Sequence, residues 1–302
     1  MILEIEGSKV GSKILKHSNA NYYTTKSILQ NMQKEDLDFF KRWFSDYVDK
    51  FSSPDSFVQE NIKMKIEHTG KVCENILLLA KSEKVKEEGC RLAETIALFH
   101  DLGRFEQFMK YKTFKDSESE NHALLGLKIL KKKGILSRLS QKERSLILKA
   151  VEYHNLMEIP ECVENSIELL FYSKLIRDAD KLDILRIVSE NYKEGGKGKN
   201  PALEIYLPDT EGCSEHIIKD ILNKRIAKIV DVNNLNDIKL LRMSWIFDIN
   251  FPTTFAILKE HKYLNTIISS MPEAEEVHII EKHLEKCLDA AEINVINKIN
   301  KP

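Results

Sequence analysis

Apolar residues recur at helical spacing over long stretches of this chain. Such stretches cover residues 66–80, 92–99, 124–130 and 175–188. A spacing of three and four residues places apolar side chains on one face of a helix. Only 7 prolines and 11 glycines interrupt the 302 residues, and alternation typical of a strand is confined to a short segment, EIYLPD, at residues 204–209. The sequence therefore predicts an all-α protein.

Clusters of turn-forming residues divide the chain. They lie at residues 52–55 (SSPD), 132–134 (KKG) and 195–201 (GGKGKNP), and such clusters mark breaks between helical segments. We interpret residues 1–55 as an N-terminal helical lead-in and residues 56–195 as the core that carries the chemistry. Residues 196–302 are predicted to form a C-terminal helical extension packed on that core.

Composition argues against several classes of protein. The 46 basic and 47 acidic side chains nearly cancel, to a net charge of -1, whereas dedicated nucleic-acid binders show a basic excess or stripe. No segment approaches the roughly 20 apolar residues that cross a bilayer, and the N-terminus lacks the apolar region of a signal peptide. The 5 cysteines are scattered and form no CxxC pair, which favours reduced thiols. We expect a cytoplasmic protein without a membrane segment or a clear nucleic-acid surface.

Potential metal ligands recur along the predicted core, each separated from the next by about the length of a helix and a turn. They are His68, the pair His100-Asp101, His122, His154 and the aspartates of the run RDADKLD at residues 177–183. In an antiparallel bundle this spacing brings one position per helix to a shared level. Imidazole and carboxylate groups together suit a borderline divalent metal, and six of them could hold two ions with one carboxylate as a bridge.

A single histidine in such a sequence is usually a partly buried or surface residue. His100 also ends an apolar run just before a glycine, and the end of a helix favours a cation there without any metal. The argument for a metal site therefore depends on the joint pattern of histidines and aspartates, and not on any one of them.

The order H…HD…H…H…D resembles that of the HD-domain superfamily of metal-dependent phosphohydrolases. The resemblance covers roughly residues 45–195 and is carried by HTGKV at 68–72, by HDLGRFEQFMKYKTFKDSESENHALLGLKIL from His100, and by DADKLD at 178–183. It implies an all-α HD-domain bundle with N- and C-terminal helical extensions. The resemblance also implies the metal ligands, which would be His68, His100, Asp101 and Asp180, with His122 and His154 as the two additional histidines of the dinuclear branch.

The HD family also implies which aspartate of the last run binds metal. Helical periodicity does not separate Asp178 from Asp180, but HD proteins commonly place the ligand in an Ala-Asp-x-Leu setting, which here is Ala179-Asp180-Lys181-Leu182. Asp178 and Asp183 would then pair helices or orient metal-bound groups.

Two differences from known branches of the HD superfamily narrow the range of expected substrates. The residues after His154 are NLMEIP, without the GYP element of the HD-GYP phosphodiesterases. Asp183 is followed by Ile184, where stringent-response nucleotide hydrolases have an asparagine after the last aspartate. Cleavage of cyclic dinucleotides and of alarmones is therefore only weakly supported.

The resemblance implies a two-metal mechanism. One ion would be held by His68, His100, Asp101 and Asp180, and the other by Asp101, His122 and His154, so that Asp101 is the bridge. A water held by two ions loses a proton far more easily than bulk water. A site richer in imidazole than in carboxylate favours manganese, iron, cobalt or zinc over magnesium.

Basic residues close to the candidate ligands suggest an anionic substrate. Arg104 could meet a phosphate with its planar fork, or it could pair with Glu106 or Asp116. Lys71 and Lys181 are further candidate phosphate anchors, although a solvated lysine is the simpler interpretation of Lys71. The loop at residues 193–199 could bind an anion through backbone amides, but a flexible linker explains its composition better.

The leading hypothesis is hydrolysis of a phosphoester of a small nucleotide or phosphorylated metabolite. The same six-ligand arrangement resembles that of inositol oxygenase, in which a di-iron site activates oxygen, so an oxygenase is an alternative. A non-catalytic sensor that binds a nucleotide is a second alternative, although it would not need every metal ligand.

Overall fold

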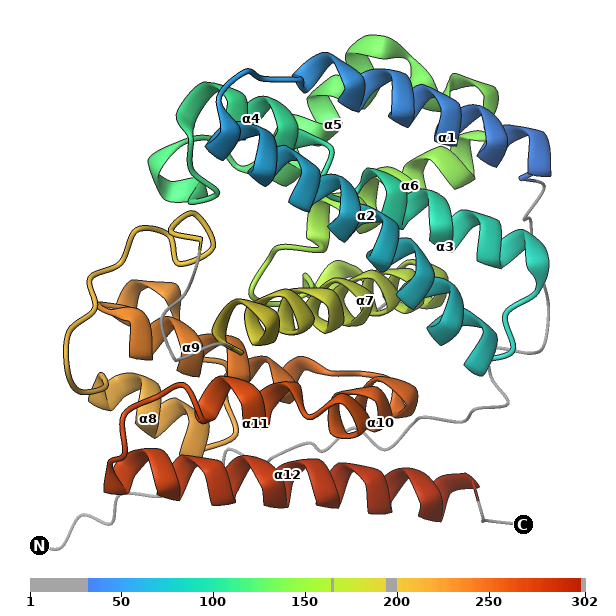
Figure 1. The fold of residues 1–302 in the computed structure, drawn as a ribbon. Helices are drawn as coiled ribbons and strands as arrows, with labels where there is room; N and C mark the ends of the chain where they lie inside the picture. The colour runs from blue at the N-terminus through green and yellow to red at the C-terminus, as the bar shows by residue number, and fades with distance from the viewer. Residues whose placement is uncertain (1–31, 164–165, 194–199, 300–302) are drawn as a thin grey trace, which may run out of the picture.

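The computed structural model describes residues 32–163, 166–193 and 200–299, which form helices joined by short loops (Figure 1). No strand occurs in these three ranges, so the predicted all-α fold is confirmed. Residues 204–209, the short alternating segment, form turns and irregular backbone instead. Ile205 and Tyr206 there have φ angles of 47° and 58°, values that exclude an extended strand.

The first described helix, α1 (Lys34–Val48), is followed by the short 3-10 turn η2 (Asp49–Phe51). It packs on α3 (Glu87–Phe99) through aromatic rings: the centroids of Phe40 and Trp43 lie 5.6 and 5.9 Å from that of Phe99. Edge-to-face ring pairs at this distance add to the energy of simple burial. The predicted lead-in, residues 1–55, lies partly outside the described residues, which begin at 32.

Helix α2 (Ser56–Ser82) begins where the sequence predicts a break, because the carboxylate of Asp55 accepts a hydrogen bond from the backbone amide of Val58. The elements after α3 are α4 (Gly103–Tyr111), η3 (Asp116–Glu118), α5 (His122–Lys133), η4 (Ile135–Arg138), α6 (Gln141–Tyr153), η5 (Glu161–Val163) and α7 (Ile167–Tyr192). Gly134 ends α5 with a φ of 61°, the left-handed conformation that favours glycine after a helix.

The C-terminal extension forms a second layer of helices. Its elements are α8 (Glu215–Leu222), η6 (Ile229–Asp231), α9 (Leu235–Ser244), η7 (Trp245–Asp248), α10 (Pro252–His261), α11 (Tyr263–Ile268) and α12 (Glu275–Ile299). Figure 1 shows α7 between the two layers, with α2 and α3 on one side and α10, α11 and α12 on the other.

The hydrophobic core changes along α7. Its residues up to Ala179 pack into the core of the first layer, and those from Leu182 onward pack into the core of the C-terminal layer. Asp180 therefore lies at the level where the two layers meet. The predicted domain boundary at 195–196 falls within residues 194–199, outside the described residues, and stays a prediction.

A close approach of α4 to α5 depends on glycine. A Cβ atom on Gly103 would lie 2.2 Å from the carbonyl oxygen of His122 and 2.8 Å from the amide nitrogen of Gly126. Any larger residue would therefore push the start of α5 away from α4.

Among the helices of the described residues, none is both long and apolar enough to cross a bilayer.

Candidate metal centre

The structure brings all six predicted metal ligands together, in two groups of three. His68 lies in the middle of α2 and Asp180 in the middle of α7, whereas His100 and His154 are the C-terminal caps of α3 and α6. The groups are His68, His100 and Asp180, and Asp101, His122 and His154. The four histidines and Asp101 are buried, and the side chain of Asp180 is 16% exposed.

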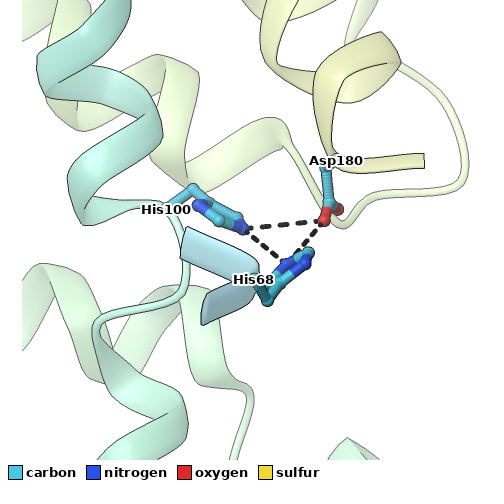
Figure 2. Close-up of side chains that lie close together, drawn as sticks. All are labelled: His68, His100 and Asp180. Atoms are coloured by element: carbon cyan, nitrogen blue, oxygen red, sulfur yellow. Dashed lines mark hydrogen bonds and ion pairs between the residues drawn. The ribbon is translucent and has the colours of Figure 1, made fainter. Parts of the chain in front are cut away.

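The first group is shown in Figure 2, in which the three side chains point toward one another. His68 Nε2 lies 3.1 Å from Asp180 Oδ1 and 3.3 Å from His100 Nε2. The distance from His100 Nε2 to Asp180 Oδ1 is 3.6 Å. These donor atoms therefore surround a single small volume.

The second group has the same form. His122 Nε2 lies 3.1 Å from His154 Nε2, and the two nitrogens lie 3.4 and 3.9 Å from Asp101 Oδ1.

Asp101 lies between the two groups. Its Oδ2 atom is 3.5 Å from His68 Nε2 and 3.7 Å from His100 Nε2, while its Oδ1 atom faces His122 and His154. One carboxylate therefore presents a separate oxygen to each group of histidines. This is the geometry that a bridging ligand between two ions requires.

In all four histidines the Nδ1 atom forms a hydrogen bond that orients the imidazole ring. His100 Nδ1 and His154 Nδ1 each lie 2.7 Å from a backbone carbonyl oxygen, of Ala97 and Val151. A carbonyl can only accept, so each Nδ1 carries the proton and each Nε2 has a free lone pair.

Carboxylates orient the other two rings. His68 Nδ1 donates to Asp183 and His122 Nδ1 donates to Asp116, each over 2.7 Å. Partners of this kind typically fix the tautomer and direction of metal-binding histidines.

The arrangement of donor atoms in the two groups favours a bound cation. Asp180 Oδ1 is buried without a hydrogen-bond partner among the described residues, and such an atom is costly to bury. The Nε2 atoms of His100 and His68 face each other at 3.3 Å, as do those of His122 and His154 at 3.1 Å. Burial lowers the pKa of both His122 and His154, so these two rings are neutral with their protons on Nδ1, and their opposed Nε2 lone pairs repel unless a cation lies between them.

Electrostatics favour a cation in the same place. Burial and Lys65 lower the pKa of His68, but Asp101, Asp180 and Asp183 outweigh them and raise this pKa to about 10. The three carboxylates thus attract positive charge to His68.

Burial, together with His122 and His100, lowers the pKa of His154 to about 3. His154 is therefore neutral near pH 7, as a metal ligand must be.

A cavity of about 550 Å³ opens onto the two groups and is lined by residues of both layers. Among the predicted phosphate anchors, Arg104 and Lys181 line it. Arg104 Nη1 donates to Asp116 over 2.9 Å, as one of the two interpretations predicts, and its Nε is buried without a hydrogen-bond partner. Arg104 Nε also lies 3.5 Å from Asp101 Oδ1, so the guanidinium pairs with two carboxylates of the site. Lys181 is buried and pairs with Asp248.

Lys71 is not in the cavity. Its ammonium pairs with Glu74 over 2.9 Å on the exposed side of α2, so the structure places it as the solvated lysine of the simpler interpretation. Lys65, three residues before His68, points the other way and lies 2.7 Å from Asp101 Oδ2. Sequence reasoning missed Lys65, although a helix places positions three residues either side of His68 near the same face.

The remaining aspartates of α7 support the fold and the site. Asp178 accepts hydrogen bonds from the backbone amides of Asn250 and Phe251 and from the hydroxyl of Thr254, at the start of α10. It is therefore turned away from the metal groups and toward the C-terminal layer. Asp183 holds His68, as described above. In the loop at residues 193–199, interpreted as a flexible linker in preference to an anion site, residues 194–199 lie outside the described residues.

An all-helical bundle in which four histidines and two aspartates converge from separate helices defines a protein with a site for divalent metal ions. Residues 66–185 match the family model described as the HD domain, and this range contains all six candidate ligands. Residues 66–185 are thus similar to an HD domain, and this domain implies a superfamily of metal-dependent hydrolases. Comparison with curated proteins and with solved structures found no matching protein.

Proposed function

We propose that the protein is a metal-dependent phosphohydrolase that cleaves a phosphoester of a small nucleotide or phosphorylated metabolite at a dinuclear site. The position of Asp101 carries this proposal, because its two oxygens face two separate histidine groups. The first ion would be held by His68, His100, Asp180 and Asp101. The second would be held by His122, His154 and the other oxygen of Asp101. The imidazole-rich set favours manganese, iron, cobalt or zinc over magnesium.

Bound ions would supply a water with a lowered pKa and would neutralise negative charge on the phosphoryl group. Hydrolysis would join a water oxygen to phosphorus and break the bond from phosphorus to the ester oxygen. The departing alkoxide takes a proton and leaves as an alcohol, with inorganic phosphate as the second product of a monoester.

Cationic side chains at the cavity fit an anionic substrate. Lys181 and Arg177 both line the cavity and pair with the same carboxylate, Asp248. Arg104 lines the same cavity, and its guanidinium is a cation that can form a charge-assisted hydrogen bond with a phosphoryl oxygen. Lys65 lies beside the proposed bridging carboxylate and is the fourth cation in reach of the same volume.

Metal analysis of the purified full-length chain, followed by a panel of phosphoesters assayed without oxygen, tests the proposal. Manganese-loaded protein should release phosphate or alcohol, and the metal-free protein should not. In parallel, iron-loaded protein is tested with an oxygen electrode against inositols and hydroxyphosphonates. Turnover that needs iron and oxygen together, with no phosphoester cleaved under any metal, would refute hydrolysis in favour of the oxygenase. Metal-loaded protein that binds nucleotides without cleaving them would favour the sensor.

A further inference from the structure

Exposed apolar side chains gather at the mouth of the cavity. Leu156 and Met157, just after α6, are 38% and 47% exposed, and Ile229 and Val230, in η6, are 53% and 81% exposed. All four line the cavity that opens onto the metal groups. Apolar side chains exposed together on a protein mark a binding surface more often than scattered ones do. We call these four residues the apolar rim.

The part of the cavity wall that the C-terminal extension forms is also apolar. The C-terminal extension contributes Trp245, Leu241, Ile226 and Ala227 to the cavity wall. Among its side chains that line the cavity, only Lys228 and the indole nitrogen of Trp245 can form hydrogen bonds. A polyol bound against this wall would lose water without regaining its hydrogen bonds, whereas an aromatic or aliphatic group would gain from burial.

Buried polar contacts hold the rim and the wall in place. Arg177 donates to the carbonyl oxygens of Leu156 and Met157 and also pairs with Asp248, which ends η7 three residues after Trp245. On the other side, the amide of Ala227 donates to the hydroxyl of Ser244 over 3.0 Å. The apolar surface is therefore a built part of the site, continuous with the metal groups.

We propose that the apolar rim and Trp245 bind the organic part of the substrate, and that the site takes phosphoesters of aromatic or other apolar groups in preference to esters of sugars and polyols. The inference rests on the proposed function for the phosphoryl end of the cavity. It assigns part of the specificity to Ile229, Val230 and Trp245, which lie outside the range that matches the HD domain. The volume of about 550 Å³ is within the usual range for sites that enclose small organic ligands.

Phosphonates, which have no ester bond to hydrolyse, separate binding from catalysis. Isothermal titration calorimetry of the manganese-loaded full chain would compare benzylphosphonate, methylphosphonate and 2,3-dihydroxypropylphosphonate. We expect benzylphosphonate to bind at least about tenfold more tightly than either of the others, because one buried aromatic ring contributes that much.

A variant of the apolar rim and a tryptophan variant show which residues produce the preference for benzylphosphonate. Replacing Ile229 and Val230 together with serine should remove most of the preference, while Ile279→Ser, a change of a 48% exposed isoleucine on α12, should leave it intact. The chain has 2 tryptophans, and the other, Trp43, stacks on Tyr47 in α1. In a Trp43→Phe variant, the emission of Trp245 should therefore change with benzylphosphonate and much less with methylphosphonate.

Equal affinities for the three phosphonates, or a preference that survives in the double serine variant, would overturn the inference. Equal affinities combined with dimerisation that the serine variant abolishes would assign the rim to a second copy of the chain, and would also overturn it. A preference for benzylphosphonate without hydrolysis of any phosphoester would refute the proposed function and leave the apolar site. Hydrolysis with equal affinities would refute the apolar site alone.

Discussion

Replacing Gly103 with alanine should damage the metal site without removing any ligand. Gly103 begins α4, two residues after Asp101, at the point where α4 meets α5. An added Cβ would lie 2.2 Å from the carbonyl oxygen of His122, and real contacts of this kind are essentially never under 3.0 Å. His122 would therefore have to move by about 0.8 Å, the difference between these two distances.

The size of that movement sets the expected effect. Functional groups tolerate displacements of only about 0.5 Å, and a misplacement of about 1 Å can lower a rate on the order of 100-fold. We expect Gly103→Ala to lose affinity for the ion at His122 and His154, and to lower kcat/KM by about 100-fold. Overpacking should also lower the free energy of unfolding by about 1–3 kcal/mol.

Gly70→Ala is the matched control. Gly70 lies in α2, two residues after His68, and an added Cβ there meets nothing within 4 Å. Alanine in a helix interior is more stable than glycine by about 0.5–1 kcal/mol, so this variant should melt no lower than the parent. Metal content by plasma mass spectrometry, thermal melts by circular dichroism and steady-state kinetics measure all three properties. Full metal content and activity in Gly103→Ala, or an equal loss in Gly70→Ala, would refute the reasoning.

Further variants separate the roles of individual residues. Asp101→Ala should lose both ions while helicity by circular dichroism survives, and two ions retained in that variant would refute the bridge. Arg104→Lys keeps the charge but loses the fork, so KM for an identified phosphoester should rise with metal content unchanged; identical kinetics would leave Arg104 with a structural role only. Asp178→Asn should lower the free energy of unfolding by about 1–3 kcal/mol through weaker hydrogen bonds to α10 and should retain metal, whereas metal loss at full stability would contradict its assignment. Lys71→Ala should change neither metal content nor kinetics, and a raised KM would return Lys71 to the site.

The sequence predicts the helical fold well because periodic burial and few helix-breaking residues act locally. Spacing of one position per helix also predicts that the histidines and aspartates lie close together, whereas the choice of Asp180 over Asp178 as a ligand depends on the resemblance to the HD family. The sequence does not distinguish Lys65 from Lys71, because each lies three residues from His68 and only the packing of α2 determines which one reaches Asp101.

The residues that form the cavity wall could not be predicted from the sequence. Trp245 and Val230 reach the site through contacts between distant segments. Asp248, after Trp245, pairs with Arg177, and the amide of Ala227, before Val230, donates to Ser244. No local pattern in either segment signals that pairing. The close approach of Gly103 to His122 is of the same kind, because a glycine in a helical stretch does not reveal what lies against it.

Hydrolysis in water enriched in oxygen-18 tests the central claim most directly. Manganese-loaded protein, kept free of oxygen gas, would be incubated with an aryl phosphate, and the released phosphate would be analysed by mass spectrometry. Attack of a metal-activated water on phosphorus predicts one labelled oxygen in each phosphate and none in the alcohol, with no release by metal-free protein. Label in the alcohol, release that is independent of metal, or turnover only with iron and oxygen gas would contradict the account.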